Sequence, residues 1–65
     1  MNANELLEQA LAGVESKSIR DWAASDHNKP VFLRMAEKYL KSKTRPESEL
    51  VNILTIMIVG YAMDM

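Results

Sequence analysis

The sequence predicts an all-α protein, a compact bundle of about four helices in which the last helix is central and hydrophobic. Apolar residues recur at helical spacing along most of the chain, and turn-forming and capping residues separate these segments. The apolar run at 50–63 has no second strand candidate to pair with, and a lone strand cannot satisfy its backbone. The expected helices span approximately residues 4–15, 18–24, 29–42 and 46–63, within a single domain covering residues 1–65.

The composition indicates a protein that gains stability from a partner. A chain of 65 residues builds a small core, and cores of this size rarely supply more than about 3–5 kcal/mol unaided. The sequence has no cysteine, which excludes disulfides, thiolate chemistry and cysteine-ligated zinc. Because 48% of the residues are hydrophobic, we expect association with another copy or with another protein.

The first helix is expected at about residues 4–15. Asn2 and Asn4 are both candidate N-caps, and Asn2 with Glu5 has the spacing of a capping box. The stripe expected to face the core consists of Leu6, Leu7, Ala10, Leu11 and Val14. The polar run at 16–18 is expected to end this helix.

The second helix is expected to be short. Ser18, with Asp21 three residues later, predicts its start, and the turn-forming side chains at 25–28 predict its end. Its expected core residues are Ile19, Trp22 and Ala23. Trp22 has an alternative role as a partly exposed interface anchor.

The third helix follows the turn. Asn28 is the predicted cap, and Pro30 suits the first turn because the amide that proline lacks would be unpaired there. The side expected to face the core carries Val31, Phe32, Met35, Ala36, Tyr39 and Leu40. The side expected to face water carries Arg34, Glu37, Lys38 and Lys41.

The last helix is predicted to have two apolar faces. Thr44 with Glu47 forms a candidate capping box, with Pro46 in the first turn. On a helical wheel the main face consists of Leu50, Ile53, Leu54, Met57, Ile58 and Tyr61. The second face consists of Asn52, Ile56, Val59, Gly60 and Met63. Three short helices cannot readily cover both sides, so we expect the second face to form a homodimer or partner interface; the alternative is a fold that wraps the helix completely.

The charge distribution singles out a basic block between two acidic segments. Residues 1–26, 27–45 and 46–65 carry net charges of −3, +5 and −3. The candidate contacts for an acidic partner or for nucleic acid are Arg34, Lys38, Lys41, Lys43 and Arg45, with Lys29 completing the block. The alternative is a solvated helix face that offsets the acidic first helix.

A nucleic-acid role gains some support from residues 18–42, whose spacing is similar to that of a helix-turn-helix. The fit is poor, because the residues that would meet the bases include Pro30, Val31 and Phe32. The sequence pI of about 5.7 also lies below that of most DNA-binding domains.

The sequence offers no catalytic, cofactor-binding or metal site. His27 is the single histidine, and its neighbours Ser25 and Asp26 do not form a triad merely by adjacency. We therefore expect a protein that is not an enzyme and needs no cofactor.

The expected function is binding and occlusion of a target protein, with the chain acting as a homodimer; small bacterial or phage regulators, inhibitors and adaptors often have this build. Nucleic-acid regulation is the second alternative and membrane association the third. The N-terminus lacks signal-peptide features, and a 14-residue apolar segment is shorter than the roughly 18–20 residues of a spanning helix, so we expect a cytoplasmic protein.

Overall fold

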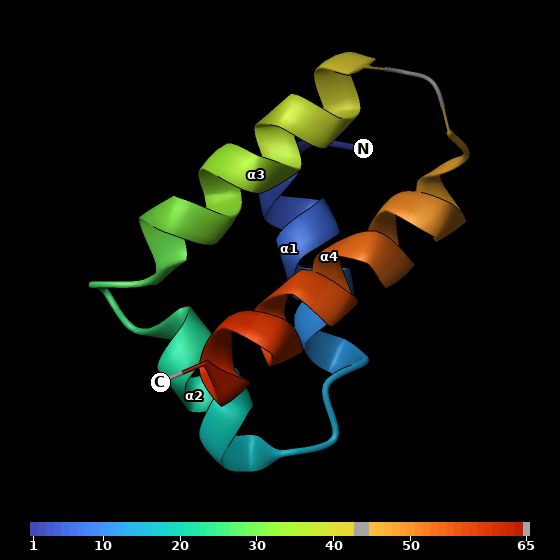
Figure 1. Cartoon of the computed structure of the whole chain (residues 1–65). Helices are drawn as coiled ribbons and strands as arrows, with labels where there is room; N and C mark the ends of the chain where they lie inside the picture. The colour runs from blue at the N-terminus through green and yellow to red at the C-terminus, as the bar shows by residue number, and fades with distance from the viewer. Residues whose placement is uncertain (43–44, 65) are drawn as a thin grey trace.

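Four α-helices joined by short connections make up the computed structural model, which describes residues 1–42 and 45–64 (Figure 1). They are α1 (Ala3–Ala12), α2 (Lys17–Ala24), α3 (Lys29–Ser42) and α4 (Glu47–Met63). The described residues contain no strand, so the predicted all-α class is confirmed. Helix α4 contacts each of the other three helices, which confirms its central place in the bundle.

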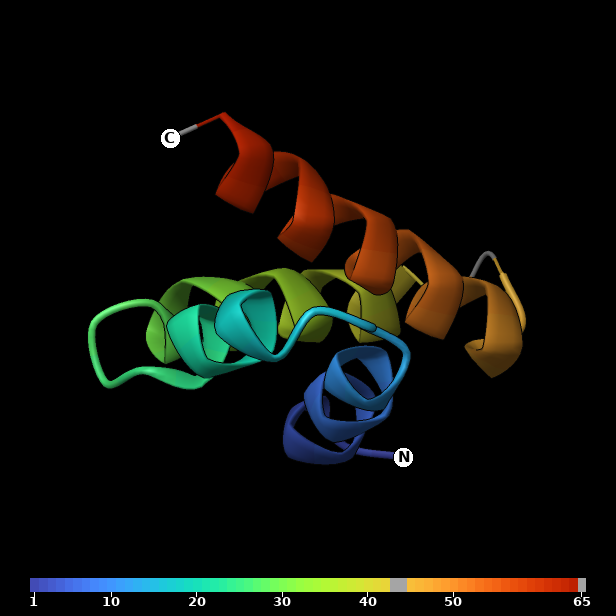
Figure 2. The same cartoon turned by 90° about the horizontal axis from the view of Figure 1, so that it is seen from below.

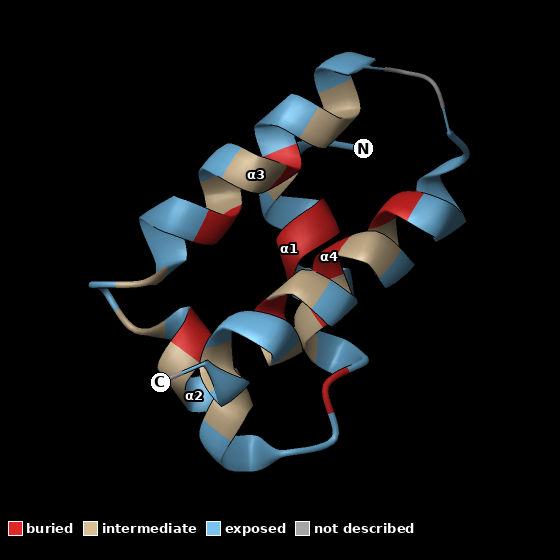
Figure 3. Cartoon of the chain, viewed as in Figure 1, coloured by how far each residue is buried: buried red, intermediate tan, exposed pale blue. Residues whose placement is uncertain are grey.

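The core lies between α4 and the layer formed by the other helices. Figure 2 shows α4 along one side of the molecule, and Figure 3 shows buried residues on the inward side of each helix. The buried residues are Leu6, Leu7, Ala10, Val14, Ala23, Phe32, Ala36, Leu50, Leu54 and Ile58. Every helix contributes to this single cluster, as expected for amphipathic segments in one small domain.

Helix α1 begins as the sequence predicts, at the first of the two candidate caps. The Glu5 amide donates to Asn2 Oδ1 at 2.9 Å, and the Asn2 amide donates to Glu5 Oε1 at 3.2 Å, which completes the capping box. The helix ends at Ala12, three residues before the expected end. Val14 is nevertheless buried in the turn that follows.

Helix α2 begins earlier than predicted. The cap is Ser16, whose hydroxyl accepts from the Ile19 amide at 3.3 Å, so the prediction of Ser18 as the first residue was wrong. The Arg20 guanidinium donates to the carbonyls of Val14 and Glu15, and these bonds tie the α1–α2 connection to α2. These bonds join residues only five and six positions apart, yet no capping or turn pattern in the sequence predicts them.

The turn at 25–28 is built by side chains, as predicted. The Asn28 carbonyl accepts from the amides of Val31 and Phe32 in α3. The Asn28 side-chain nitrogen instead donates to the Trp22 carbonyl at 3.0 Å and to Ser25 Oγ at 3.2 Å. Asn28 therefore stabilises the end of α2 with its side chain. Val31 was predicted to face the core but is 43% exposed.

Helix α4 starts one residue later than predicted, at Glu47. Pro46 is its N-cap and provides no side-chain hydrogen bond, so it precedes the first turn. The predicted cap residue Thr44 lies outside the described residues. Glu47 and Glu49 lie in the first turn, where their charges interact favourably with the helix dipole.

Candidate protein-binding surface

Helix α4 presents one face to the core, as the helical wheel predicts. Leu50, Leu54 and Ile58 are at most 4% exposed. Ile53 and Met57, which were assigned to the same face, are only half-buried, whereas Val51 packs against the core cluster. Tyr61 was assigned to the same face but is 41% exposed.

The opposite side of α4, which we call the outer face, consists of Asn52, Ile56, Val59, Gly60 and Met63. Ile56 is 68% exposed and Met63 is 76% exposed, and Asn52 and Gly60 are exposed as well. The side of α4 turned toward the viewer in Figure 3 carries several exposed positions. No charged residue occurs from Leu50 to Met63, so most of this helix surface is uncharged.

Val59 and Thr55 mark one edge of the outer face. Val59 is half-buried and packs against the core cluster, so it contributes only part of its surface. The Thr55 hydroxyl lies within hydrogen-bond distance of the Ala10 carbonyl, at 3.1 Å, and of the Val51 carbonyl, at 2.8 Å. This edge of α4 is therefore anchored to α1.

Three aromatic rings support the C-terminal half of α4. The Trp22 and Phe32 rings are 5.6 Å apart in an edge-to-face arrangement, and the Phe32 and Tyr61 rings are 6.0 Å apart. Phe32 is buried and Trp22 is half-buried, whereas Tyr61 reaches the surface. The rings hold α2, α3 and α4 together beneath the exposed end of α4. Tyr61 is the residue that sequence reasoning missed for this surface.

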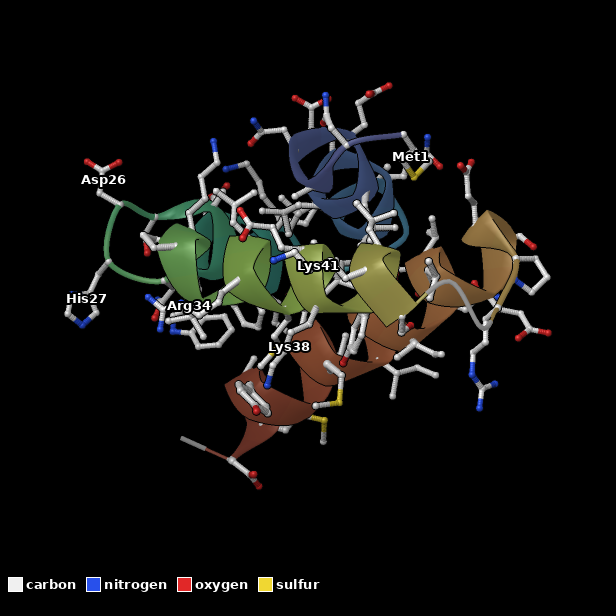
Figure 4. All side chains as sticks on the ribbon, turned by 90° about the horizontal axis from the view of Figure 1, so that it is seen from above. Met1, Asp26, His27, Arg34, Lys38 and Lys41 are labelled. Carbon is white, nitrogen blue, oxygen red and sulfur yellow. The ribbon has the colours of Figure 1, made fainter. Side chains whose placement is uncertain are left out.

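The basic block does not form one patch. Arg34, Lys38 and Lys41 are exposed along the outer side of α3, and Figure 4 shows them following that helix. Arg45 instead forms an ion pair with Glu49 at 3.4 Å, and Lys43 lies outside the described residues. We call the first three residues the basic stripe. None of the ion pairs among residues 1–42 and 45–64 involves them.

A shallow pocket of about 440 Å³ lies where the ends of α3 and α4 meet the N-terminal residue. Its lining consists of Met1, Leu40, Lys41, Arg45, Glu47 and Leu50. The Met1 amino group is 3.9 Å from the Glu47 carboxylate. The Met1 side chain is only 9% exposed, so the 41% exposure of the whole residue comes chiefly from its backbone. The side chain thus covers apolar surface at this end of the core.

The turn residues considered for catalysis do not converge. Asp26 and His27 are exposed and point away from the body in different directions in Figure 4. The Ser25 hydroxyl donates to the Trp22 carbonyl at 2.8 Å. Across the described ranges, no three residues of the metal-ligating types gather closely enough to hold an ion.

None of the described helices combines the length and the apolar character that crossing a membrane requires.

The fold and surface define a class, a small all-α protein of four helices with an exposed apolar helix face. Comparison with protein-family models finds no match, and neither does comparison with curated proteins or with solved structures.

Proposed function

We propose that this protein is a small non-enzymatic interaction module, a regulator, inhibitor or adaptor, that binds and covers a surface of another protein molecule through the outer face of α4. The observation that carries the proposal is the exposure of Ile56 and Met63, at 68% and 76%, within the uncharged stretch Leu50–Met63 of the most hydrophobic helix. An exposed apolar face on an otherwise covered helix is typical of protein-binding sites.

The energetics favour covering this face. Burying one large aliphatic side chain is worth about 1.5–3 kcal/mol, and two such side chains lie on the same face. Methionine suits a contact surface because its unbranched chain adapts to the shape of the partner. A partner that covered Ile56 and Met63 would therefore stabilise a fold whose own core is small.

The basic stripe supplies a charged border to this surface. Lys38 extends from α3 on the side of α4 in Figure 4, while Arg34 lies nearer the turn before α3. Charges at the rim of an apolar interface affect the rate and specificity of binding more than its strength. We infer that the stripe selects targets with acidic residues around an apolar centre.

Site-specific photo-cross-linking tests the proposal. A photoreactive residue replaces Ile56 in cells that express the full chain, and a matched protein carries the same residue in place of Glu8, which is exposed on α1. We expect a covalent adduct with a protein from position 56 and none from position 8. Absence of any adduct at position 56, with the folded protein present, would contradict the proposal.

Nucleic-acid binding by the basic stripe is the second candidate function. Its support is the exposure of three cations on one line of α3 without an acidic partner among the described residues. Three phosphate contacts would give a plot of log affinity against log salt with a slope of about −2.7 for duplex DNA. A gel shift at several salt concentrations, with Lys38→Glu and Lys41→Glu as controls, measures this slope. Lack of retention at low salt would exclude the role.

A further inference from the structure

We propose that the outer face of α4 binds the same face of a second copy, with the two α4 helices antiparallel and Ile56 of each copy seated on Gly60 of the other. This inference rests on the proposed function and specifies its partner. It starts from Gly60, a residue that the fold of one chain does not require.

Gly60 lies inside α4, where glycine is unfavourable. A glycine in a helix interior costs about 0.5–1 kcal/mol relative to alanine because it loses more backbone freedom on folding. Close packing within the chain does not explain its presence, since a Cβ atom added at Gly60 would meet nothing within 4 Å. A helix from another molecule that approaches here would explain it, because a missing side chain admits a close neighbour.

Ile56 supplies the side chain that fits this gap. It lies one turn before Gly60 on the same side of α4, and its side chain projects from the surface, with the residue 68% exposed. When two such helices run antiparallel about a two-fold axis between these positions, each isoleucine faces the glycine of the other helix. The contact is reciprocal, as an isologous interface requires.

The polar groups at the ends of the face agree with the antiparallel alignment. The two-fold axis lies midway between Ile56 and Gly60, and Asn52 and Asp64 are equally far from it along the sequence. Asn52 of one copy therefore lies opposite Asp64 of the other. An asparagine amide donates to a carboxylate, so the pair is complementary in both directions. The uncharged stretch between Leu50 and Met63 brings no like charges together at the centre.

The available area matches a weak dimer. The chain exposes 4471 Å² and measures 30 × 20 × 19 Å, so one side of it can supply only a modest interface. A standard interface covers about 800 Å² per partner, which would be roughly a fifth of this surface. We expect a weak dimer, with a dissociation constant between about 1 μM and 1 mM.

Sedimentation equilibrium of the full chain across this concentration range measures self-association. The decisive variant is Gly60→Leu, which adds apolar surface to the face yet fills the gap that Ile56 needs. We expect it to weaken the dimer by about tenfold or more through overpacking. Ser48→Leu, which adds the same side chain at an exposed position in the first turn of α4, is the matched control and should leave the dimer within about twofold.

Two results would overturn the inference. One is a wild-type chain that remains monomeric up to about 1 mM; the other is a Gly60→Leu dimer that is as strong as the wild type or stronger. Circular dichroism at low concentration confirms that each variant is folded. Gly60→Ala serves as a second variant, which should retain or raise helix stability while weakening the dimer.

Disulfide trapping tests the antiparallel alignment, because the sequence contains no cysteine of its own. An oxidised mixture of Ile56→Cys and Gly60→Cys proteins should give mainly the mixed disulfide. A predominance of the Ile56→Cys homodimer would contradict the antiparallel alignment. The cross-linking at position 56 separates this inference from the proposed function, since an adduct only with a different protein would retain the function and reject the second copy.

Discussion

Single polar side chains connect the helices at specific points, and Thr55 joins α4 to α1 in this way. One hydroxyl hydrogen is shared between two acceptors, at 3.1 Å from the Ala10 carbonyl and 2.8 Å from the Val51 carbonyl. The Ala10 carbonyl belongs to the last turn of α1 and also accepts from the Gly13 amide at 3.1 Å. The Thr55 hydroxyl therefore adds a second donor to a carbonyl at the end of α1 and links that end to α4.

Replacing Thr55 by valine should lower the free energy of unfolding by about 0.5–1.5 kcal/mol, the usual net value of one hydrogen bond. The shape of the side chain is retained, so packing contributes little to the change. Urea denaturation measures the difference. Thr55→Ser is the control, because it keeps the hydroxyl and removes the methyl group. A serine variant that loses as much as the valine variant would show that packing, and not the hydrogen bond, is responsible.

The environment of Asp21 lowers the pKa of its carboxyl group. The hydrogen bond from Lys17, at 2.8 Å, and the lysine's charge hold the pKa of the Asp21 carboxyl below its usual value of 3.8. A lowered pKa in the folded state means that the pair stabilises the fold above pH 3.8, and that this contribution disappears as the pH falls through the folded-state pKa. We expect Lys17→Met to raise the Asp21 pKa, which NMR titration of the carboxyl carbon measures. An unchanged pKa in this variant would contradict the assignment.

At the scale of elements, the start of α1 shows how local signals position a helix. The N-cap is Asn2 and not Asn4. The Asn2 side chain accepts from the Glu5 amide, and the Glu5 carboxylate accepts from the Asn2 amide. We expect Asn2→Ala to lower the free energy of unfolding by about 1 kcal/mol. Asn4→Ala is the matched control and should have little effect, because Asn4 is exposed within the first turn. Thermal and urea unfolding measure both variants, and equal losses would contradict the capping role.

The start of α1 was predictable from the sequence, whereas the start of α2 was not. The capping box at Asn2 involves residues three apart, so the sequence contains its full pattern. The start of α2 was misplaced because Ser16 and Ser18 are both good caps, and sequence alone cannot choose between them. The Arg20 bonds to the preceding connection select the earlier start. Val31 was assigned to the core by its spacing, but it is exposed, and Phe32 is the first residue of α3 that is buried.

At the scale of the whole molecule, periodicity predicted the buried side of α4 better than its edges. Leu50, Leu54 and Ile58 were expected in the core and are there. Val59 was grouped with the exposed face, yet it packs against the core cluster. Tyr61 was grouped with the core face, yet it is exposed. A helical wheel gives angles around one helix, whereas coverage depends on where the neighbouring helices end. The lengths of α2 and α3 decide this, and they are not properties of α4.

The two sides of α4 should respond oppositely to substitution and to protein concentration. Leu54 is fully buried, so Leu54→Ala should cost about 2–5 kcal/mol, comparable to all the stability that a core of this size supplies. We expect that variant to be largely unfolded at room temperature at every concentration. Ile56→Ala removes a side chain that is 68% exposed and should leave the fold of a single chain intact.

If two copies associate through the outer face, the melting temperature of the wild type must rise with concentration, because a dimer of folded chains draws the equilibrium away from the unfolded state. Ile56→Ala should abolish that rise while matching the wild type at the lowest concentration. Calorimetry over about a hundredfold range of protein concentration measures both melting temperatures. A protein concentration of about a hundred times the dissociation constant stabilises the folded state by about 2.7 kcal/mol. A wild-type melting temperature that is independent of concentration would mean that the outer face of α4 is free of a second copy.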